Sequence, residues 1–320
     1  MKAWVYDRYG SPDVLEWADV EAPSPKDGEV LIRVRAAGLN AADWRMLRGR
    51  PRLIRLMNGL RRPRRRTTIG SDVAGVVESV GGGVTRFGPG DEVYAEVGNG
   101  GCAELIPVAE PSIARRPATA TFEQAAAVPM AGLTALQGLR DHGRVRAGQH
   151  VLVNGASGGV GTFTVQLAKA FGAEVTAVCS GRNVELIRSL GADHVVDYTR
   201  EDVTLGEPRF DLIMDIAGTH PLRHYRRVMT RGATYVMVGS VVDRFLRPIL
   251  YGKVLTLVTR ERVTSFVAKR NAEDLADLAE RIDAGQIAPV IDRTYPMAEV
   301  PDAVRYLEAG HVAGKLVLTV

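Results

Sequence analysis

The sequence predicts an α/β protein of two domains, in which a β-rich domain is interrupted by a doubly wound parallel sheet flanked by helices. The chain has 320 residues, and domains of roughly 100–200 residues make two the expected number. Residues 1–117 read as short strands separated by glycine and proline, whereas residues 118–259 alternate strands and helices. Residues 260–320 end in a strand that we expect to pack back on the first domain. The β-rich domain would therefore combine 1–117 with 260–320.

In the β-rich domain, alternating apolar and polar residues predict strands. The clearest are "EVLIRVRAAGL" (29–39), "DVAGVVESVG" (72–81) and "FGPGDEVYAEV" (87–97). A helical stretch follows over 121–143, where Thr121 is a suitable N-cap and Gln124 stands three residues further on, as in a capping box. The pattern of the chain therefore changes near residue 118.

In the second domain, short apolar strands alternate with amphipathic helices, which is typical of a parallel sheet covered on both faces. The predicted strands are "HVLVNG", "EVTAVCS", "HVVDY", "FDLIMDIAG", "ATYVMVGS" and "VLTLVT". The helix "VGTFTVQLAKAFGA" has one predicted buried face, formed by Val160, Phe163, Thr164, Leu167, Ala168 and Phe171. Near the end of the chain we expect helices over 271–287 and 299–310 and a strand over 314–320.

The composition excludes several classes of protein. Apolar residues make up 46% of the chain, which is enough for ordinary cores. No apolar run approaches the roughly 18–20 residues that cross a bilayer, and "MKAWVYDRYG" lacks the apolar region of a secretory signal. The two cysteines, Cys102 and Cys179, form neither a disulfide framework nor a zinc cluster. We therefore expect a soluble cytoplasmic protein without a transmembrane segment.

The net charge of +4 conceals one strongly basic segment. Arg45–Arg66 contains ten arginines and no acidic residue, so the rest of the chain is acidic. Such a segment could contact anionic lipid, nucleic acid or a phosphate, but it carries no aromatic residue or recognition motif, so we do not expect nucleic-acid binding. Among the arginines, the residues Leu53, Ile54, Leu56, Met57 and Leu60 are apolar at near-helical spacing. A solvated loop, a lid over an apolar substrate, a peripheral membrane contact and a self-association surface all remain open.

The stretch "VLVNGASGGVG" joins a predicted strand to a predicted helix through four glycines. Glycines allow a sharp turn and a close approach of a pyrophosphate, and the first amides of the helix then hold the anion. In register with G-x-G-x-x-G, Ala156 replaces the first glycine, and Gly158 and Gly161 take the other two positions. The residues expected to contact a dinucleotide here are Gly155, Ala156, Ser157, Gly158, Gly159 and Val160.

The end of the next predicted strand indicates which dinucleotide. A site for NAD normally has Asp or Glu there to bind the ribose 2′-hydroxyl. This chain instead has Ser180, Gly181, Arg182 and Asn183. A hydroxyl and a guanidinium suit a 2′-phosphate, so we expect NADPH rather than NADH.

With these residues in view, the chain resembles the medium-chain dehydrogenase/reductase superfamily, in its zinc-independent quinone-oxidoreductase branch. The resemblance runs nearly from end to end. It rests on "AAGLNAADW", "GSDVAGVVESVG", "PGDEVYA", "AAAVPMAGLTALQGL", "VLVNGASGGVG", "GADHVVDYT" and "GKLVLTV". It implies a GroES-like catalytic domain (1–117 and 260–320), a Rossmann NADP-binding domain (118–259) and a homodimer whose edge strands come from "GATYVMVGS" and "VLTLVT".

No metal is expected. The zinc-dependent relatives keep a catalytic cysteine where this chain has Asn40 and a His-Glu pair where it has Ser71-Asp72. Amide and hydroxyl side chains are not zinc ligands. The only close histidine pair in the sequence, His220 and His224, encloses a proline and has no third ligand nearby in the sequence.

The resemblance also implies roles around the cofactor. Thr134 would face the nicotinamide or its phosphate, and Ser180, Arg182 and Tyr198 would surround the 2′-phosphate. For Tyr198, an aromatic cover of the sheet edge is an equal alternative. The remaining implied residues are Ala217 and Gly218 lining the site, Val238, Gly239 and Ser240 near the carboxamide, and Lys315 on a phosphate.

Without zinc, hydride transfer favours quinones and α,β-unsaturated carbonyls over plain alcohols, because hydrogen-bond donors alone stabilise the developing enolate. Asn40 is the candidate donor, with a turn residue as the alternative; Asp43 would orient Asn40 or cap the following helix. No tyrosine or histidine stands out as the proton donor, so water is expected to protonate the product. The alternatives are a non-catalytic NADPH-binding protein with a membrane, RNA or protein partner, and an NADP-dependent alcohol dehydrogenase.

Overall fold

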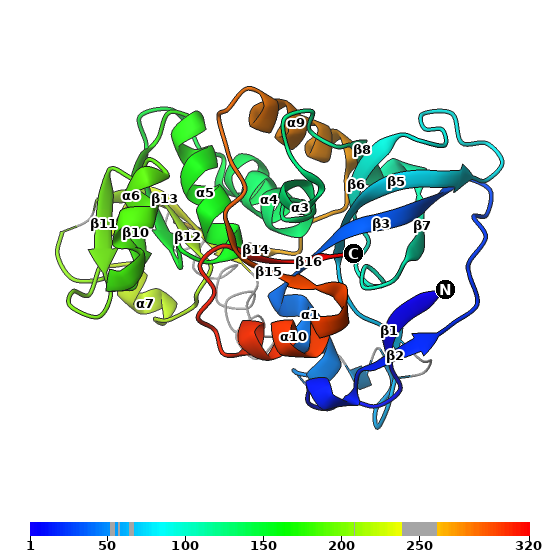
Figure 1. Cartoon of the computed structure of the whole chain (residues 1–320). Helices are drawn as coiled ribbons and strands as arrows, with labels where there is room; N and C mark the ends of the chain where they lie inside the picture. Colours follow the sequence, from blue (N-terminus) through cyan, green and yellow to red (C-terminus); the bar gives the residue numbers. More distant parts are fainter. Residues whose placement is uncertain (52–54, 57, 64–66, 208, 239–260) are drawn as a thin grey trace. The chain divides into compact units, whose positions relative to one another are not determined.

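The computed structural model describes residues 1–51, 55–56, 58–63, 67–207, 209–238 and 261–320 (Figure 1). The chain forms two compact units. Unit 1 comprises Met1–Leu133, Arg270–Gly285 and Pro289–Val320, and unit 2 comprises Thr134–Lys269 and Gln286–Ala288. The sequence placed the first boundary near residue 118, but the chain leaves unit 1 only within helix α4 (Pro129–Gln137).

The later boundary has a packing reason. Helix α3 (Phe122–Ala126) belongs to unit 1 because it packs closely on strand β3 (Glu29–Leu39). A Cβ atom at Gly38 would come within 2.2 Å of the Ala126 carbonyl oxygen, so only glycine permits this approach. The predicted capping box of α3 is present, with Gln124 donating its backbone N–H to the hydroxyl of Thr121.

Unit 1 contains a seven-stranded sheet in the order β15-β16-β3-β5-β6-β8, with β7 also paired to β3. Its other strands are β5 (Asp72–Val80), β6 (Glu92–Glu96), β7 (Leu105–Ala109), β8 (Ile113–Arg115), β15 (Ile291–Pro296) and β16 (Lys315–Thr319). Strand β16 runs antiparallel to β3, with Leu316 opposite Leu39, and Figure 1 shows the two side by side. The end of the chain thus completes the sheet begun by the first residues, as expected.

A smaller sheet, β2-β1-β4, and further helices complete the described part of unit 1. The strands are β1 (Lys2–Tyr6), β2 (Glu16–Asp19) and β4 (Thr67–Thr68); the helices, besides α3, are α1 (Ala41–Arg48), α9 (Ala272–Asp283) and α10 (Val300–Glu308). Ile32, Val73 and Leu316 are fully buried in one core with Ile113 and Leu39. Each such side chain contributes about 1.5–3 kcal/mol by leaving water.

Unit 2 contains a six-stranded parallel sheet in the order β11-β10-β9-β12-β13-β14. The strands are β9 (His150–Asn154), β10 (Glu174–Cys179), β11 (His194–Asp197), β12 (Phe210–Asp215), β13 (Met229–Val238) and β14 (Arg262–Phe266). Counted along the chain, this is the 3-2-1-4-5-6 order of dinucleotide-binding sheets, whose switch point lies between the first and fourth strands. The predicted Rossmann fold class is therefore confirmed, and the ligand position it implies is the carboxyl end of β9 and β12.

Helices α5 (Gly159–Ala170), α6 (Val184–Ser189) and α7 (Leu222–Tyr225) connect these strands. Helix α5 packs on β9 and β10, while α6 packs on β10 and β11. The sequence predicted that only one face of α5 is buried. In the structure every residue from Gly161 to Ala168 is buried, so the helix is covered on all sides over this stretch. The long predicted helix over 121–143 is divided, since Pro129 lacks the amide that would continue α3 and instead begins α4.

Two expectations concern the far end of this sheet. The predicted strand "VLTLVT" lies outside the described residues, and the last described strand is β14, which sequence reasoning did not identify. Strand β13 pairs with both β12 and β14. "GATYVMVGS" is therefore not an edge strand of the sheet as described.

The basic segment is described only in part, because residues 52–54, 57 and 64–66 lie outside the described residues. Arg48 forms an ion pair of 2.7 Å with Glu308, and the Arg55 guanidinium lies 5.0 Å from the ring centre of Tyr9. Leu56 and Leu60 are more than half exposed. The described helices include none long and apolar enough to cross a membrane.

Candidate active site

The glycine loop of unit 2 turns the chain sharply from β9 into α5. Gly155 has a φ of +86°, a left-handed conformation that favours glycine. A Cβ atom at Gly161 would lie 2.2 Å from the Gly155 carbonyl oxygen, so the helix can start this close to the strand only with glycine there. These two positions explain why the turn needs its glycines.

The turn leaves backbone amides available at the start of α5. The first hydrogen bond across the helix start joins the Thr162 amide to the Gly158 carbonyl at 2.9 Å, and the N-cap Gly158 has no side chain to cap the turn. The amides of Gly159, Val160 and Gly161 therefore have no protein partner among the described residues. Open amides and the positive end of a helix dipole are the arrangement that suits an anion, and here they lie at the sheet's switch point.

The other predicted loop residues have different tasks. The amides of Gly155 and Ala156 both donate to the Val178 carbonyl, at 3.2 and 3.0 Å, and fix the loop to β10. Ala156 is fully buried, which explains why a small side chain replaces the first glycine of the motif. Ser157 is half-buried beside Gly158. The Gly158 amide donates to the Gly155 carbonyl at 3.3 Å, so the amides of the predicted set without a backbone partner among the described residues are those of Ser157, Gly159 and Val160.

A buried polar network supports the loop after β12. Asp215 accepts hydrogen bonds from Asn154 Nδ2 (2.7 Å), the Gly218 amide (2.9 Å) and Tyr235 Oη (2.5 Å). Asn154 also donates to Tyr225 Oη at 2.8 Å. The network fixes Gly218, and the amide of the exposed Ala217 bonds to the Asn154 carbonyl at 3.3 Å. Sequence reasoning missed it, although the polar residues that end β9 and β12 were a visible signal.

The predicted 2′-phosphate residues gather at the ends of β10 and β11. The Tyr198 amide donates to the Cys179 carbonyl at 3.1 Å, which places Tyr198 beside Ser180 in the fold. Tyr198 is 61% exposed, so its ring does not cover the sheet edge as a buried residue would. Arg182 is exposed on the short helical turn Gly181–Asn183.

A carboxylate also stands here. No acidic residue ends β10, but Asp197 at the end of β11 lies against Gly181, where a Cβ atom would be 2.6 Å from Asp197 Oδ2. The amide and hydroxyl of Thr199 donate to Asp197 Oδ1 at 3.0 and 2.8 Å, and these bonds lower the pKa of Asp197. Asp197 is therefore already engaged as an anchor of its own turn.

Unit 1 holds a second polar cluster, formed by Asn40, Asp43, Ser71, Asp72 and Lys315, all of them buried. Asn40 precedes α1, Asp72 begins β5 and Lys315 begins β16. Lys315 Nζ donates to Asn40 Oδ1 and lies 3.0 Å from Asp72 Oδ2. Asn40 Nδ2 donates to the same Asp72 oxygen at 2.8 Å. The amide of Asn40 is thus held from both ends.

Asp43 takes the capping role. Its carboxylate accepts the Asn40 backbone amide at 2.6 Å and the Ser71 hydroxyl at 2.5 Å. Burial raises the pKa of Asp43 to about 6, although the hydrogen bond from Ser71 opposes this shift. Asp43 therefore positions the backbone of Asn40, and the Asn40 side chain is oriented instead by Asp72 and Lys315.

Glu96 adds a further buried acid, opposite Asp72 across β5 and β6. Burial, followed by the nearby Asp72 charge, raises the pKa of Glu96 to about 7. Its Oε2 is buried without a hydrogen-bond partner, and Arg270 lies 3.7 Å from its Oε1. Both residues line a cavity of about 410 Å³ within unit 1. Sequence reasoning gave Glu96 no role.

The side-chain groups of the cluster around Asn40 and Asp72 do not suit zinc as ligands. They are an amide, a hydroxyl and carboxylates, whereas structural and catalytic zinc sites are built mainly from His and Cys. The Lys315 ammonium already contacts the oxygens of Asn40 and Asp72 that a cation would need. The resemblance placed Lys315 on a cofactor phosphate; in the structure its Nζ is bound within this cluster.

The remaining predicted cofactor residues are placed as follows. Thr134 is half-buried in the middle of α4, and Val238 is buried at the end of β13. Gly239 and Ser240 lie outside the described residues. His220 and His224 have ring centres 5.8 Å apart, but they are not part of any group of three potential metal ligands in the described structure.

Comparisons with known proteins agree with this architecture. Residues 26–138 match the family model described as alcohol dehydrogenase GroES-like domain, and residues 190–318 match the one described as zinc-binding dehydrogenase. The NAD(P)H oxidoreductase RTN4IP1, mitochondrial, of Mus musculus is 36% identical and aligns with 100% of this chain and 89% of its own length. The NADPH-dependent alkenal/one oxidoreductase, chloroplastic, of Arabidopsis thaliana is 35% identical, covering 99% of this chain and 79% of the relative.

A solved structure gives the same result. The quinone oxidoreductase from Coxiella burnetii superposes with a TM-score of 0.88 and 29% identity, covering 100% of this chain and 99% of that one. The strand order of unit 2 is that of a dinucleotide-binding sheet, and the identity to RTN4IP1 exceeds one third over the full chain. Both observations indicate the same family. The chain belongs to the medium-chain dehydrogenase/reductase superfamily, in its quinone-oxidoreductase-like branch.

Proposed function

We propose that this protein is an NADPH-dependent oxidoreductase that transfers a hydride to a quinone or an α,β-unsaturated carbonyl compound. The observation that carries the proposal is the set of open amides at the start of α5, at the switch point of a 3-2-1-4-5-6 sheet. The names of relatives, an NAD(P)H oxidoreductase and an alkenal/one oxidoreductase, support the same class of reaction.

The preference for NADPH rests on the ends of β10 and β11. Ser180, Arg182 and Tyr198 offer two hydroxyls and a guanidinium, a donor set that suits a phosphate better than a bare ribose. Asp197 is an acid at this place that would oppose a 2′-phosphate. Its carboxylate is held by Thr199 and has Arg200 at 3.6 Å, which offsets part of its charge.

At the substrate, Asn40 is proposed as the hydrogen-bond donor. Bound NADPH supplies the hydride, and negative charge then develops on the substrate oxygen. Asn40 Nδ2 uses one hydrogen on Asp72, and its second hydrogen has no partner among the described residues. The Lys315 ammonium bonded to Asn40 Oδ1 polarises the amide and makes that hydrogen a stronger donor. Lys315 and Asp72 are therefore positioning residues for Asn40.

Two alternatives can be separated from this proposal. An alcohol dehydrogenase would need stronger polarisation of its substrate than an amide gives, and the buried cluster does not suit zinc. A non-catalytic interaction protein is favoured by one observation, the exposed Leu56 and Leu60 within the basic segment. That reading predicts cofactor binding without turnover.

The test is whether the purified full chain oxidises NADPH, and the reaction is monitored through the loss of the nicotinamide absorbance. The panel contains phenanthrenequinone, naphthoquinone, a simple alkenal, a simple ketone and NADPH without acceptor. Turnover with a quinone or the alkenal, but not with the ketone, is expected. Binding of NADPH with no turnover across the panel would favour the interaction protein, and no binding of NADPH by calorimetry would refute both.

A further inference from the structure

Three polar side chains meet at the amino ends of β9, β10 and β11. His150, Glu174 and His194 are the first residues of these adjacent parallel strands. His150 is opposite Glu174 in the register, and His194 is opposite Thr176, two residues after Glu174. Because side chains alternate with a period of two, all three project from one face of the sheet. The group lies at the opposite end of the strands from the glycine loop.

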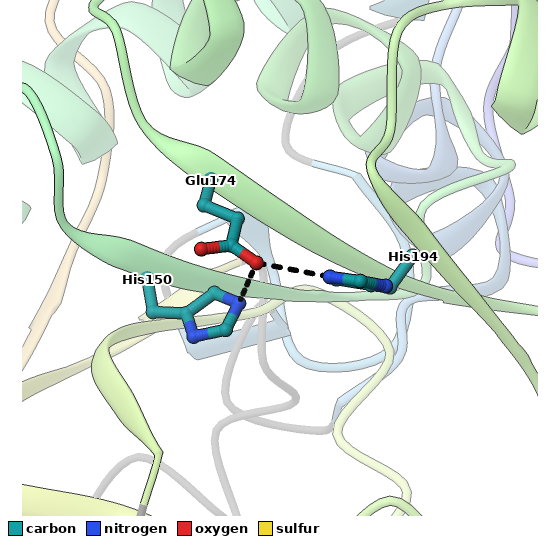
Figure 2. A group of neighbouring side chains, drawn as sticks. All are labelled: His150, Glu174 and His194. Carbon is teal, nitrogen blue, oxygen red and sulfur yellow. Dashed lines mark hydrogen bonds and ion pairs between the residues drawn. The ribbon is translucent and has the colours of Figure 1, made fainter.

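The ligand atoms of this group converge. His150 Nε2 lies 3.0 Å and His194 Nε2 lies 2.9 Å from the same oxygen, Glu174 Oε1. Figure 2 shows both rings turned toward this carboxylate. One ligand atom from each residue lies within 4.8 Å of the other two, and no other such group of three occurs in the described part of the chain.

One of these nitrogens is not satisfied by the protein. His150 Nε2 is buried and, although close to Glu174, does not have a hydrogen bond of acceptable geometry. Buried polar atoms in folded proteins nearly always have a partner, so an orphan nitrogen calls for a ligand. His194, by contrast, is more than half exposed and leaves the group open to solvent.

We propose that His150, Glu174 and His194 bind a divalent zinc ion. Two imidazoles and a carboxylate are ligands of the kind zinc takes at about 2.0–2.1 Å, and a tetrahedron of that size separates its ligand atoms by about 3.3 Å. The observed separations from the carboxylate oxygen are only a few tenths of an ångström shorter. Small rotations of the Glu174 and histidine side chains would lengthen both separations, and water would be the fourth ligand.

The charged residues next to the group have partners of their own and do not occupy the three proposed ligands. Asp193 is paired with Lys169 at 2.8 Å, and Asp211 accepts the His150 backbone amide at 3.0 Å, so each has another partner. The nearby Arg209 lies over the ring of Phe210, 4.8 Å from its centre. A bound ion would join the starts of three strands, and its role would be to stabilise unit 2 rather than to take part in hydride transfer.

The experiment measures metal binding by the full chain in the absence of NADPH. Metal-free protein is titrated with Zn²⁺ by calorimetry, and Co²⁺ is added separately as a spectroscopic probe. We expect one zinc per chain, a visible Co²⁺ spectrum of four-coordinate intensity, and a rise in the melting temperature with zinc. His194→Ala and Glu174→Gln should each weaken zinc binding by at least about tenfold, the size of loss typical when a supporting metal contact is removed.

His311→Ala is the matched control, because it removes another exposed histidine away from the group. It should bind zinc like the unmodified chain. The proposal is overturned if the unmodified chain binds no zinc, or if zinc and the Co²⁺ spectrum persist unchanged in both His194→Ala and Glu174→Gln. Stabilisation on acidification without zinc binding would instead identify a protonated His–Glu–His cluster. None of these readouts depends on NADPH turnover, so this proposal and the proposed function fail separately.

Discussion

Lys315 Nζ lies 3.0 Å from Asp72 Oδ2, and the two side chains are 3% and 0% exposed. An ion pair this deeply buried gains little over an apolar pair, but removing one partner leaves the other charge without compensation. The pair also determines the orientation of Asn40, which contacts both groups. Stability and the proposed hydrogen-bond donor therefore depend on the same contact.

Lys315→Met should reduce the free energy of unfolding by about 3–5 kcal/mol, because it leaves Asp72 buried and unpaired. Combining it with Asp72→Asn should recover part of that loss, since the orphan charge is then removed. Denaturant unfolding of both variants checks this. A loss below about 1 kcal/mol for the single variant would mean that water reaches Asp72.

Gly161→Ala should destabilise unit 2 and abolish tight NADPH binding. The added Cβ would meet the Gly155 carbonyl 2.2 Å away, and overpacking of this kind costs about 1–3 kcal/mol. Gly158→Ala is the matched comparison, because its Cβ would lie an ordinary 3.7 Å from the same oxygen. It should fold normally and weaken only NADPH binding, as seen by melting temperature and calorimetry. Equal stability of the two variants would contradict the steric argument.

The stability of the protein should depend on pH through Glu96. The pKa of this buried carboxyl rises from 4.5 to about 7 on folding, so the folded state holds the proton more tightly than the unfolded state. This contribution is complete below about pH 4.5 and is lost as the pH rises through about 7, amounting to at most about 3 kcal/mol. Asp43, with a pKa of about 6, acts in the same direction.

Glu96→Gln isolates this effect, since the variant carries no charge to bury. The difference in unfolding free energy between variant and unmodified chain should shift in favour of the variant between pH 5 and pH 8. The slope due to Asp43 should remain in both proteins. A difference that does not change with pH would show that Glu96 is ionised at its ordinary pKa.

The fold was largely predictable because its signals are local. The predicted strand "EVLIRVRAAGL" coincides with β3, since alternation and a following turn are both visible in the sequence. The glycine loop was likewise recognisable from its position between strand and helix. Strand β14 was missed because "RVTSF" is short and mixed in character, while the nearby "VLTLVT" has the stronger apolar signal.

The polar clusters were not predictable in the same way. Asn40, Asp72 and Lys315 meet only through the pairing of β3, β5 and β16, and Lys315 is 275 residues from Asn40 in the sequence. The sequence therefore identified Asn40 and Lys315 separately but not their bond. His150, Glu174 and His194 each begin a predicted strand, yet only the strand order β11-β10-β9 brings them together.

Arg182→Ala should raise the dissociation constant of NADPH by about 10- to 100-fold, the value of a hydrogen bond to a charged group. NADH binding should change little, because it has no 2′-phosphate. Arg188→Ala is the control, since Arg188 is an exposed arginine on the following helix and pairs with Glu185. Calorimetric titration with both cofactors checks the result. Equal weakening of NADPH and NADH would remove the 2′-phosphate assignment from Arg182.

Asn40→Ala should lower kcat by about 10²–10³-fold, the usual effect of losing one donor to a developing oxyanion, while NADPH binding remains unchanged. Because Asn40 also bridges Asp72 and Lys315, a structural effect must be separated from a catalytic one. Ser71→Ala serves for this, as it removes a hydrogen bond to Asp43 in the same cluster without removing the amide. Suppose that Ser71→Ala lowers kcat as much as Asn40→Ala and the two variants have equal melting temperatures. The cluster then affects kcat by maintaining the local structure, and Asn40 is not the donor. If kcat falls only in Asn40→Ala, the amide hydrogen left unused by Asp72 is the group that stabilises the substrate oxygen.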